Sequence, residues 1–230
     1  MEIVRRRKYL ILIVSLVGSL LITSLTHGSA LASVVSTVLV TLVMLAVFLA
    51  VFAGRLERNV ALAVTVVTIA VAWLHHVWPH EHQLVQAVVH LSLHALFLGF
   101  AVFVILGNVL KQRLVTTDEV LGVVAGYLLA AASWANIYAL TELLQPGSFS
   151  MGQQFAADLP DWHGRAAVFN YFSMVTLTTI GYGDITPTRP PATVFAAVEA
   201  IFGQFYIAVV VAQLVGLRLA QGSRPDDVRR

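Results

Sequence analysis

The chain has 230 residues, of which 58% are hydrophobic and only 11% are charged, and its formal net charge is +2 at pH 7. Soluble domains carry roughly a quarter charged residues, so this composition excludes an ordinary soluble enzyme and indicates an integral membrane protein. The absence of cysteine excludes disulfides and thiolate metal or redox chemistry.

Apolar stretches divide the chain into predicted membrane-spanning helices, each of which needs about 20 apolar residues. A shorter stretch, about Ala166–Thr178, does not reach across a bilayer and leads into a segment that contains two glycines. Irregular backbone at membrane depth occurs only where it is buried or lines a cavity, so this stretch predicts a re-entrant helix. The six long stretches are about Tyr9–Leu25, Ala30–Ala53, Val60–Trp78, Leu84–Leu110, Val120–Leu144 and Thr193–Leu219.

The first apolar stretch has a second interpretation. Arg5–Lys8, Tyr9–Leu25 and Ala30–Ser33 follow the order of the three regions of a cleavable signal peptide. The apolar run is longer than a normal signal core, and the next one begins almost at once. We therefore interpret it as a retained span, and the mass of the mature protein would decide between the two.

Histidines mark the third and fourth stretches. His75 and His76 lie at the outer end of the third, and His90 and His94 stand four residues apart on the fourth, where they could share a metal ion or a haem. The alternative is an interfacial belt with two histidines that hydrogen-bond between helices. No acidic group that would orient metal ligands accompanies them, which favours the structural interpretation.

Basic residues predict the orientation of the spans. Of the 14 Lys and Arg, 12 fall in the segments that would lie together on one side, and only Arg165 and Arg189 fall on the other. The positive-inside rule then places both termini in the cytoplasm, with the loop before the last span outside the cell (plasma or inner) membrane. No basic stripe with interleaved aromatics predicts a nucleic-acid partner.

The longest polar stretch between spans predicts a cytoplasmic linker at residues 111–119, with Thr117 or Asp118 as N-cap of the fifth helix. Residues 1–110 would then form a four-helix transmembrane domain, residues 120–220 a second membrane domain, and residues 221–230 a short tail without a ligand-binding domain. Gly122 and Gly126 form a GxxxG pattern that predicts close helix packing. Pro and Gly residues between 145 and 164 predict an external loop of turns.

The segment that says most about function is Thr-Leu-Thr-Thr-Ile-Gly-Tyr-Gly-Asp at residues 176–184, whose residue types suit the binding of K⁺ by oxygen atoms. A pore that strips water from K⁺ must replace it with rings of oxygens, which backbone carbonyls supply. Consecutive carbonyls can face one axis only if backbone conformations alternate, with some φ angles positive. Gly181 and Gly183 tolerate such angles because they have no Cβ, and Thr179 can add a ring of hydroxyls at the inner end.

This segment resembles the selectivity filter of the tetrameric potassium-channel family, closely from about Phe172 to Thr186 and loosely to about Leu219. The resemblance implies K⁺ as the permeant ion, with no enzymatic activity and no cofactor. One chain supplies one filter segment, so a homotetramer in the lipid bilayer is implied. The implied K⁺-coordinating residues are Thr179, Ile180, Gly181, Tyr182 and Gly183, with Thr178 as filter support, Asp184 at the outer mouth and the Tyr182 phenol as an outward-pointing brace.

One position departs from the family pattern. Some members carry a carboxylate nine residues before the mouth aspartate, hydrogen-bonded behind the filter, and here that position is Val175. A filter braced by such an acid pair is therefore not expected.

Three residues of the last span are further candidates. The resemblance implies that Gly203 is where this helix bends to open a gate, while close packing is an equally good explanation. Glu199 shares a helix face with Gly203, and we expect it to hydrogen-bond the pore helix at Asn170, Tyr171 or Ser173 rather than to attract ions. Gln204 is expected to face the cavity below the filter.

The predicted fold is an all-α membrane protein with six transmembrane helices and a re-entrant pore helix and selectivity filter between helices 5 and 6. The predicted function is passive, K⁺-selective conduction that is not steeply voltage-gated. One alternative is an intramembrane metal- or haem-binding protein that uses His75, His76, His90 and His94. The other is the ion-conducting subunit of a potassium transporter, but those resemble four filter repeats in one chain and this chain has one.

Overall fold

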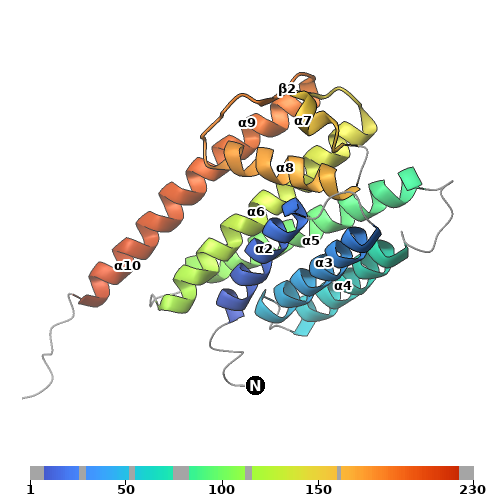
Figure 1. Ribbon diagram of the computed structural model, residues 1–230. Coiled ribbons are helices and arrows are strands. Elements are labelled where there is room, and N and C mark those ends of the chain that lie inside the picture. The colour runs from blue at the N-terminus through green and yellow to red at the C-terminus, as the bar shows by residue number, and fades with distance from the viewer. Residues whose placement is uncertain are drawn as a thin grey trace, which may run out of the picture.

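The computed structural model describes residues 8–25, 30–51, 55–74, 83–111, 116–159 and 162–222, and it is mostly helical there (Figure 1). The first four helices are α2 (Lys8–Leu25), α3 (Ala30–Val51), α4 (Arg55–Leu74) and α5 (Gln83–Lys111). After them come α6 (Thr117–Leu144), α7 (Gln153–Ala156), α8 (Trp162–Leu177), α9 (Pro190–Phe205), the π-helical turn η2 (Tyr206–Val211) and α10 (Ala212–Gly222).

The helices follow the predicted apolar stretches closely. Four segments in the described part of the chain are long and apolar enough to cross a membrane, judged by length and composition alone. Two further apolar helices, Lys8–Ile22 and Arg58–Leu74, are shorter, so six crossings per chain stay a prediction. The four long segments are Val34–Val51, Leu84–Val109, Thr117–Leu144 and Pro190–Leu219.

Helices from both sides of the predicted linker share one hydrophobic core. Leu12 of α2, Met44 of α3 and Phe97 of α5 are buried in the same cluster as Ala125 and Leu129 of α6. Helix α2 also packs against the predicted pore helix α8. The first half of the chain therefore lies directly against α6 and α8, while α10 extends away from the bundle (Figure 1).

Helix α6 begins one residue earlier than predicted. Thr116, rather than Thr117 or Asp118, is the N-cap: its hydroxyl accepts a hydrogen bond from the Asp118 N–H at 3.3 Å. The Glu119 carboxylate accepts the Thr116 N–H at 2.8 Å. This reciprocal arrangement is a capping box, which satisfies backbone N–H groups that the first helical turn leaves unpaired.

The close packing predicted from the GxxxG pattern is confirmed. A Cβ on Gly126 would lie 2.6 Å from the Tyr206 hydroxyl of the last span, and one on Gly122 would lie 3.1 Å from the Tyr9 ring of α2. The two glycines therefore let α6 approach two different helices through aromatic side chains.

The described part of the chain is mostly helical, as predicted, with one small two-stranded sheet in addition. Strand β1 (Phe149–Met151) pairs antiparallel with β2 (Ile185–Pro187), so the loop before the pore helix is joined to the segment after the filter motif. The Glu142 carboxylate accepts the N–H groups of Gly147 and Ser148 at 2.8 and 2.9 Å, which folds the chain back toward β2. Composition alone did not indicate these hydrogen bonds between the turn at Gly147 and the Glu142 carboxylate.

Candidate ion-conduction site

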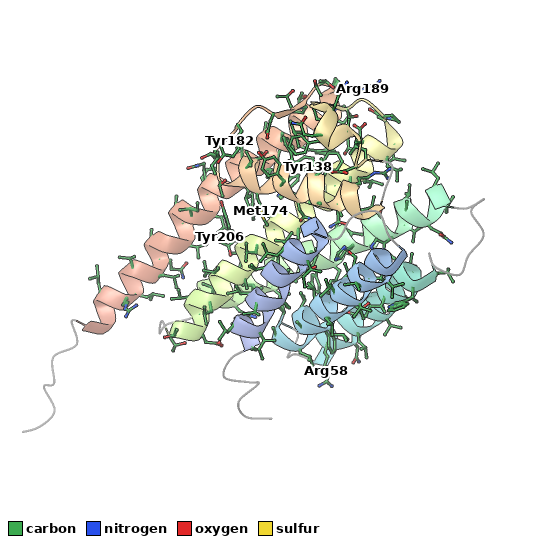
Figure 2. All side chains as sticks on the ribbon, viewed as in Figure 1. Arg58, Tyr138, Met174, Tyr182, Arg189 and Tyr206 are labelled. Atoms are coloured by element: carbon green, nitrogen blue, oxygen red, sulfur yellow. The ribbon has the colours of Figure 1, made fainter. Side chains whose placement is uncertain are left out.

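The candidate filter leaves the C-terminal end of α8 as an extended loop (Figure 2). Three of its N–H groups bond back to that end: Thr179 to the Thr176 carbonyl at 2.9 Å, and Ile180 and Gly181 to the Val175 carbonyl at 3.0 and 3.4 Å. The donors of the loop are thus turned toward the pore helix. Within the described residues, no hydrogen bond ends on the carbonyls of residues 179–182, which leaves those oxygens available to a cation.

The backbone of this loop alternates in the way that the filter chemistry requires. Gly181 and Gly183 have φ angles of +59° and +78°, which confirms the expectation for both glycines. Thr179 also lies in the left-handed region, at +58°. Such a φ is uncommon and strained for a β-branched residue, and strain of this kind gathers at functional sites. Left-handed residues at every second position let successive carbonyls turn to the same side of the chain.

At the C-terminal end of the candidate filter, Asp184 is held by Tyr171 of α8. The Tyr171 hydroxyl donates to Asp184 Oδ2 at 2.5 Å, and the Ile185 N–H donates to Oδ1 at 3.0 Å. The hydrogen bond to this carboxylate raises the pKa of the Tyr171 phenol to about 12. Tyr171 therefore fixes the orientation of the Asp184 carboxylate.

Behind the filter, Glu199 is completely buried, and its two carboxylate oxygens accept hydrogen bonds from Tyr138 and Ser173. The expectation that Glu199 bonds the pore helix is correct for Ser173. It is wrong for Asn170, which donates to the Ala166 carbonyl at 2.8 Å, and for Tyr171, which bonds Asp184.

Tyr138 of α6 is a supporting residue that sequence analysis missed. Its ring packs against Phe149 and Phe172, with centroids 5.6 and 5.0 Å away. Its position near the pore helix is visible in Figure 2. A tyrosine in the middle of a span is a signal of this kind of site, because a buried phenol needs a hydrogen-bond partner.

Further phenols join α6 to α8 and to the last span. The Tyr127 hydroxyl donates to the Leu177 carbonyl at 2.8 Å, and the Tyr206 hydroxyl donates to the Val123 carbonyl at 2.7 Å. Gln204 Nε2 donates to the Thr179 hydroxyl at 3.1 Å, so Gln204 contacts the inner end of the filter segment. The last carbonyls of a helix carry partial negative charge, which favours a cation below them.

Tyr182 and Ile180 stand apart from this network. In the single chain their side chains are 67% and 54% exposed. No hydrogen bond joins the Tyr182 phenol to another described residue of its own chain, so its predicted bracing role needs a partner from elsewhere.

Gly203 packs directly against the end of the pore helix. A Cβ at this position would lie 2.2 Å from the Leu177 carbonyl oxygen, well inside any real contact. Three residues later the helix changes to the π-helical turn η2, which the sequence did not predict. π-Helical turns interrupt the regular hydrogen-bond ladder and are frequent at functional sites. Close packing therefore explains why a glycine stands at position 203. The irregular helical turn follows it along the chain.

We expect Gly203→Ala to destabilise the protein, since overpacking at a rigid backbone contact costs about 1–3 kcal/mol. The melting temperature should fall and the open probability should change several-fold, while ion selectivity is retained. Gly216→Ala is the matched control, because nothing lies within 4 Å of its Cβ position. Thermal unfolding and single-channel recording measure both effects, and a Gly203→Ala protein that behaves like Gly216→Ala would contradict the packing role.

His90 and His94 lie close together on α5. The rings of His90 and His94 have centroids 5.5 Å apart. No group of three or more metal-ligating side chains occurs among the described residues. His75 and His76 lie outside those residues.

Comparison with known proteins bears on the same region. The ion channel family model matches residues 163–217, which run from α8 through the filter segment into α10. Two-pore potassium channel 5 of Arabidopsis thaliana and two pore potassium channel c of Oryza sativa subsp. japonica are each 42% identical to this chain over 45 residues, or 20% of its length. That match spans 11% and 10% of the two relatives, about a tenth of their length. No solved structure matches the chain. Residues 163–217 are thus similar to an ion channel family, and the apolar helices of the chain indicate a multi-pass membrane protein.

Proposed function

We propose that the chain is the subunit of a K⁺-selective channel that conducts passively through the backbone oxygens of Thr179–Gly183. The observation that carries this proposal is the left-handed backbone at every second residue of the segment, Thr179, Gly181 and Gly183, behind a helix that takes up its N–H groups. Thr178 and Asp184 would support the filter and its outer mouth. The names of the two similar plant proteins, both potassium channels, support the choice of ion.

A cyclic assembly of four copies belongs to the proposal. A ring of carbonyl oxygens needs several filter segments, and one chain supplies one. The last span supports assembly: 24% of its apolar window is buried within the chain, against 50% for the windows of α5 and α6. Neighbouring copies would cover its exposed face and the side chains of Ile180 and Tyr182, and lipid the rest. We place both termini in the cytoplasm, as the distribution of Lys and Arg predicts.

The experiment that tests this function is ion flux from liposomes that contain the purified protein. Vesicles loaded with K⁺ and diluted into Na⁺ should develop an inside-negative potential, which a potential-sensitive dye detects. Vesicles loaded with Na⁺ and diluted into K⁺ should develop the opposite potential. No potential in either arrangement, or potentials of the reversed sign, would refute K⁺ selectivity. The mass of the intact detergent-solubilised complex should equal four copies of the chain.

We expect weak or no intrinsic voltage dependence. Moving one charge across a membrane is worth about 2.3 kcal/mol per 100 mV, and voltage sensors move 3–4 charges in each of four subunits. The fourth apolar stretch, Leu84–Leu110, contains no Lys or Arg, so it offers no comparable lever. Conductance measured against voltage in symmetrical K⁺, without blocking ions, should change little, whereas a steep sigmoid equivalent to several charges would overturn this prediction.

A further inference from the structure

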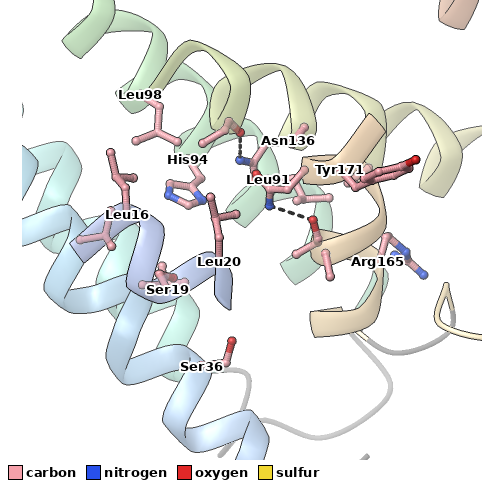
Figure 3. Close-up of a pocket in the computed structure, with 18 of the residues that line it drawn as sticks. Leu16, Ser19, Leu20, Ser36, Leu91, His94, Leu98, Asn136, Arg165 and Tyr171 are labelled. Carbon is pink, nitrogen blue, oxygen red and sulfur yellow. Dashed lines mark hydrogen bonds between the residues drawn. The ribbon is translucent and has the colours of Figure 1, made fainter. Parts of the chain in front are cut away.

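A cavity of about 310 Å³ lies behind the pore helix, away from the filter. Its walls come from α2 and α3 on one side, α5 and α6 on another, and α8 on the third. Most of the lining residues are apolar, such as Leu16, Leu20 and Leu98, and alanines of α6 and α8 keep the space open. Figure 3 shows this space between the first helix and the pore helix.

Two polar atoms in this wall have no hydrogen-bond partner although they are buried: Nε2 of His94 and Oδ1 of Asn170. A buried polar atom without a partner is costly, and native proteins rarely keep one without a reason. Asn170 uses its amide nitrogen on the Ala166 carbonyl. Nε2 of His94 and Oδ1 of Asn170 are therefore available to bond a ligand in the cavity.

These two atoms define the ligand chemistry. The amide oxygen of Asn170 accepts a hydrogen bond, so a ligand must offer a donor. A hydroxyl that gives its one proton to Asn170 can still accept a hydrogen bond from the Nε2–H of the imidazole. No described carboxylate lines the cavity. Arg165 does line it, but in Figure 3 it points away from His94, and its Nε donates to the Leu159 carbonyl at 2.9 Å. The polar wall therefore suits a neutral group.

We propose that this cavity binds a small uncharged molecule with an apolar body and one hydroxyl, the chemistry of a medium-chain alkanol. At about 30 Å³ for each water-sized group, the volume holds on the order of ten non-hydrogen atoms. The hydroxyl bonds His94 and Asn170, and the alkyl chain lies along the leucines of α2 and α5. The bound molecule joins the first helices to the back of the pore helix. Any effect on conduction rests on the proposed channel function, while binding itself does not.

Photolabelling of the full-length protein tests this site without measuring ion flux. The probe is an octanol that carries a diazirine, and the matched control probe is the corresponding octane without the hydroxyl. We expect the octanol probe to label lining residues of α2, α5 or α8, with excess unlabelled octanol reducing that labelling. The variants His94→Phe and Asn170→Leu should each reduce labelling at least fivefold, while Asn108→Leu, an exposed position on α5 outside the cavity, should not.

A cavity-filling variant, Ala132→Leu, should also remove the labelling and keeps the test independent of the two polar substitutions. Each variant is first shown to elute as the same assembly as the unmutated protein. Equal labelling by the octane probe would overturn the role assigned to the hydroxyl and indicate a site for any apolar chain. Absence of labelled lining residues in the unmutated protein would overturn the site itself and indicate that water or lipid fills the space.

Discussion

Gly181→Ala is expected to abolish K⁺ conduction. Gly181 has a φ of +59°, and a residue with a Cβ pays about 1–2 kcal/mol to adopt left-handed backbone. Over four copies the cost is about 4–8 kcal/mol, which depopulates the conducting backbone by roughly a thousandfold or more. The space around Gly181 is open within the chain, so this effect comes from backbone conformation rather than from a clash.

The matched control is Gly107→Ala on α5, where the Cβ position also has nothing within 4 Å but the backbone is helical. Flux measurements on liposomes with equal amounts of each variant make the comparison. Gly107→Ala should conduct like the unmutated protein. If Gly181→Ala also conducts normally, left-handed backbone at this position is not needed for permeation and the filter assignment fails.

Glu199→Leu is expected to cause the second large loss, this time in the stability of the pore module. The substitution leaves the hydroxyl of Tyr138 buried without its acceptor, which costs about 1–3 kcal/mol. It also removes one of the two acceptors that the Ser173 hydroxyl contacts, the other being the Ala131 carbonyl. Ser173 lies on α8, which leads into the candidate filter, so a disturbance of its contacts reaches the filter. We therefore expect loss of conduction together with a lower melting temperature. Thermal unfolding in detergent and liposome flux measure the two effects.

Glu199→Gln should be tolerated, and hydrogen-bond counting shows why. Ser173 Oγ lies 2.8 Å from the Ala131 carbonyl and also contacts Glu199, but a hydroxyl has one proton to donate. A glutamine amide can donate to Ser173 while its oxygen accepts from Tyr138, so every partner is satisfied. A glutamine variant as unstable as Glu199→Leu would show that the negative charge itself is required.

A double substitution tests whether Tyr138 and Glu199 act together. Removing the phenol with Tyr138→Phe also removes the group that Glu199→Leu would orphan. The double variant should therefore lose less stability than the two single variants added together, as residues in direct contact usually do. Additive losses would mean that the hydrogen bond between them contributes little.

The candidate filter could be picked out from sequence because the chemistry proposed for it demands particular residues in a fixed order. The positive φ angles of Gly181 and Gly183 could be predicted because glycine has no Cβ. The helices could be predicted from the length of the apolar stretches. The positive φ of Thr179 could not be predicted, because threonine rarely adopts left-handed backbone. The surrounding structure holds Thr179 in that conformation.

The features that sequence analysis missed all depend on contacts between distant segments. Tyr138 lies 61 residues before its partner Glu199, and Tyr127 lies 50 residues before Leu177. Strand β2 forms only because β1 is folded back against it, and the π-helical turn η2 lies in an apolar run that reads as ordinary helix. Local patterns cannot rank the possible partners of a buried carboxylate, so Asn170 and Tyr171 seemed as suitable as Ser173.

The measurement that tests K⁺ selectivity most directly is the reversal potential of single channels formed by the purified protein in planar bilayers, with KCl on one side and NaCl on the other. Carbonyl coordination by Thr179–Gly183 predicts a reversal potential far from zero, with the sign set by K⁺ diffusion, and no measurable inward Na⁺ current. A reversal potential at zero, with both cations carrying current equally, would contradict the assignment of this segment as a potassium selectivity filter.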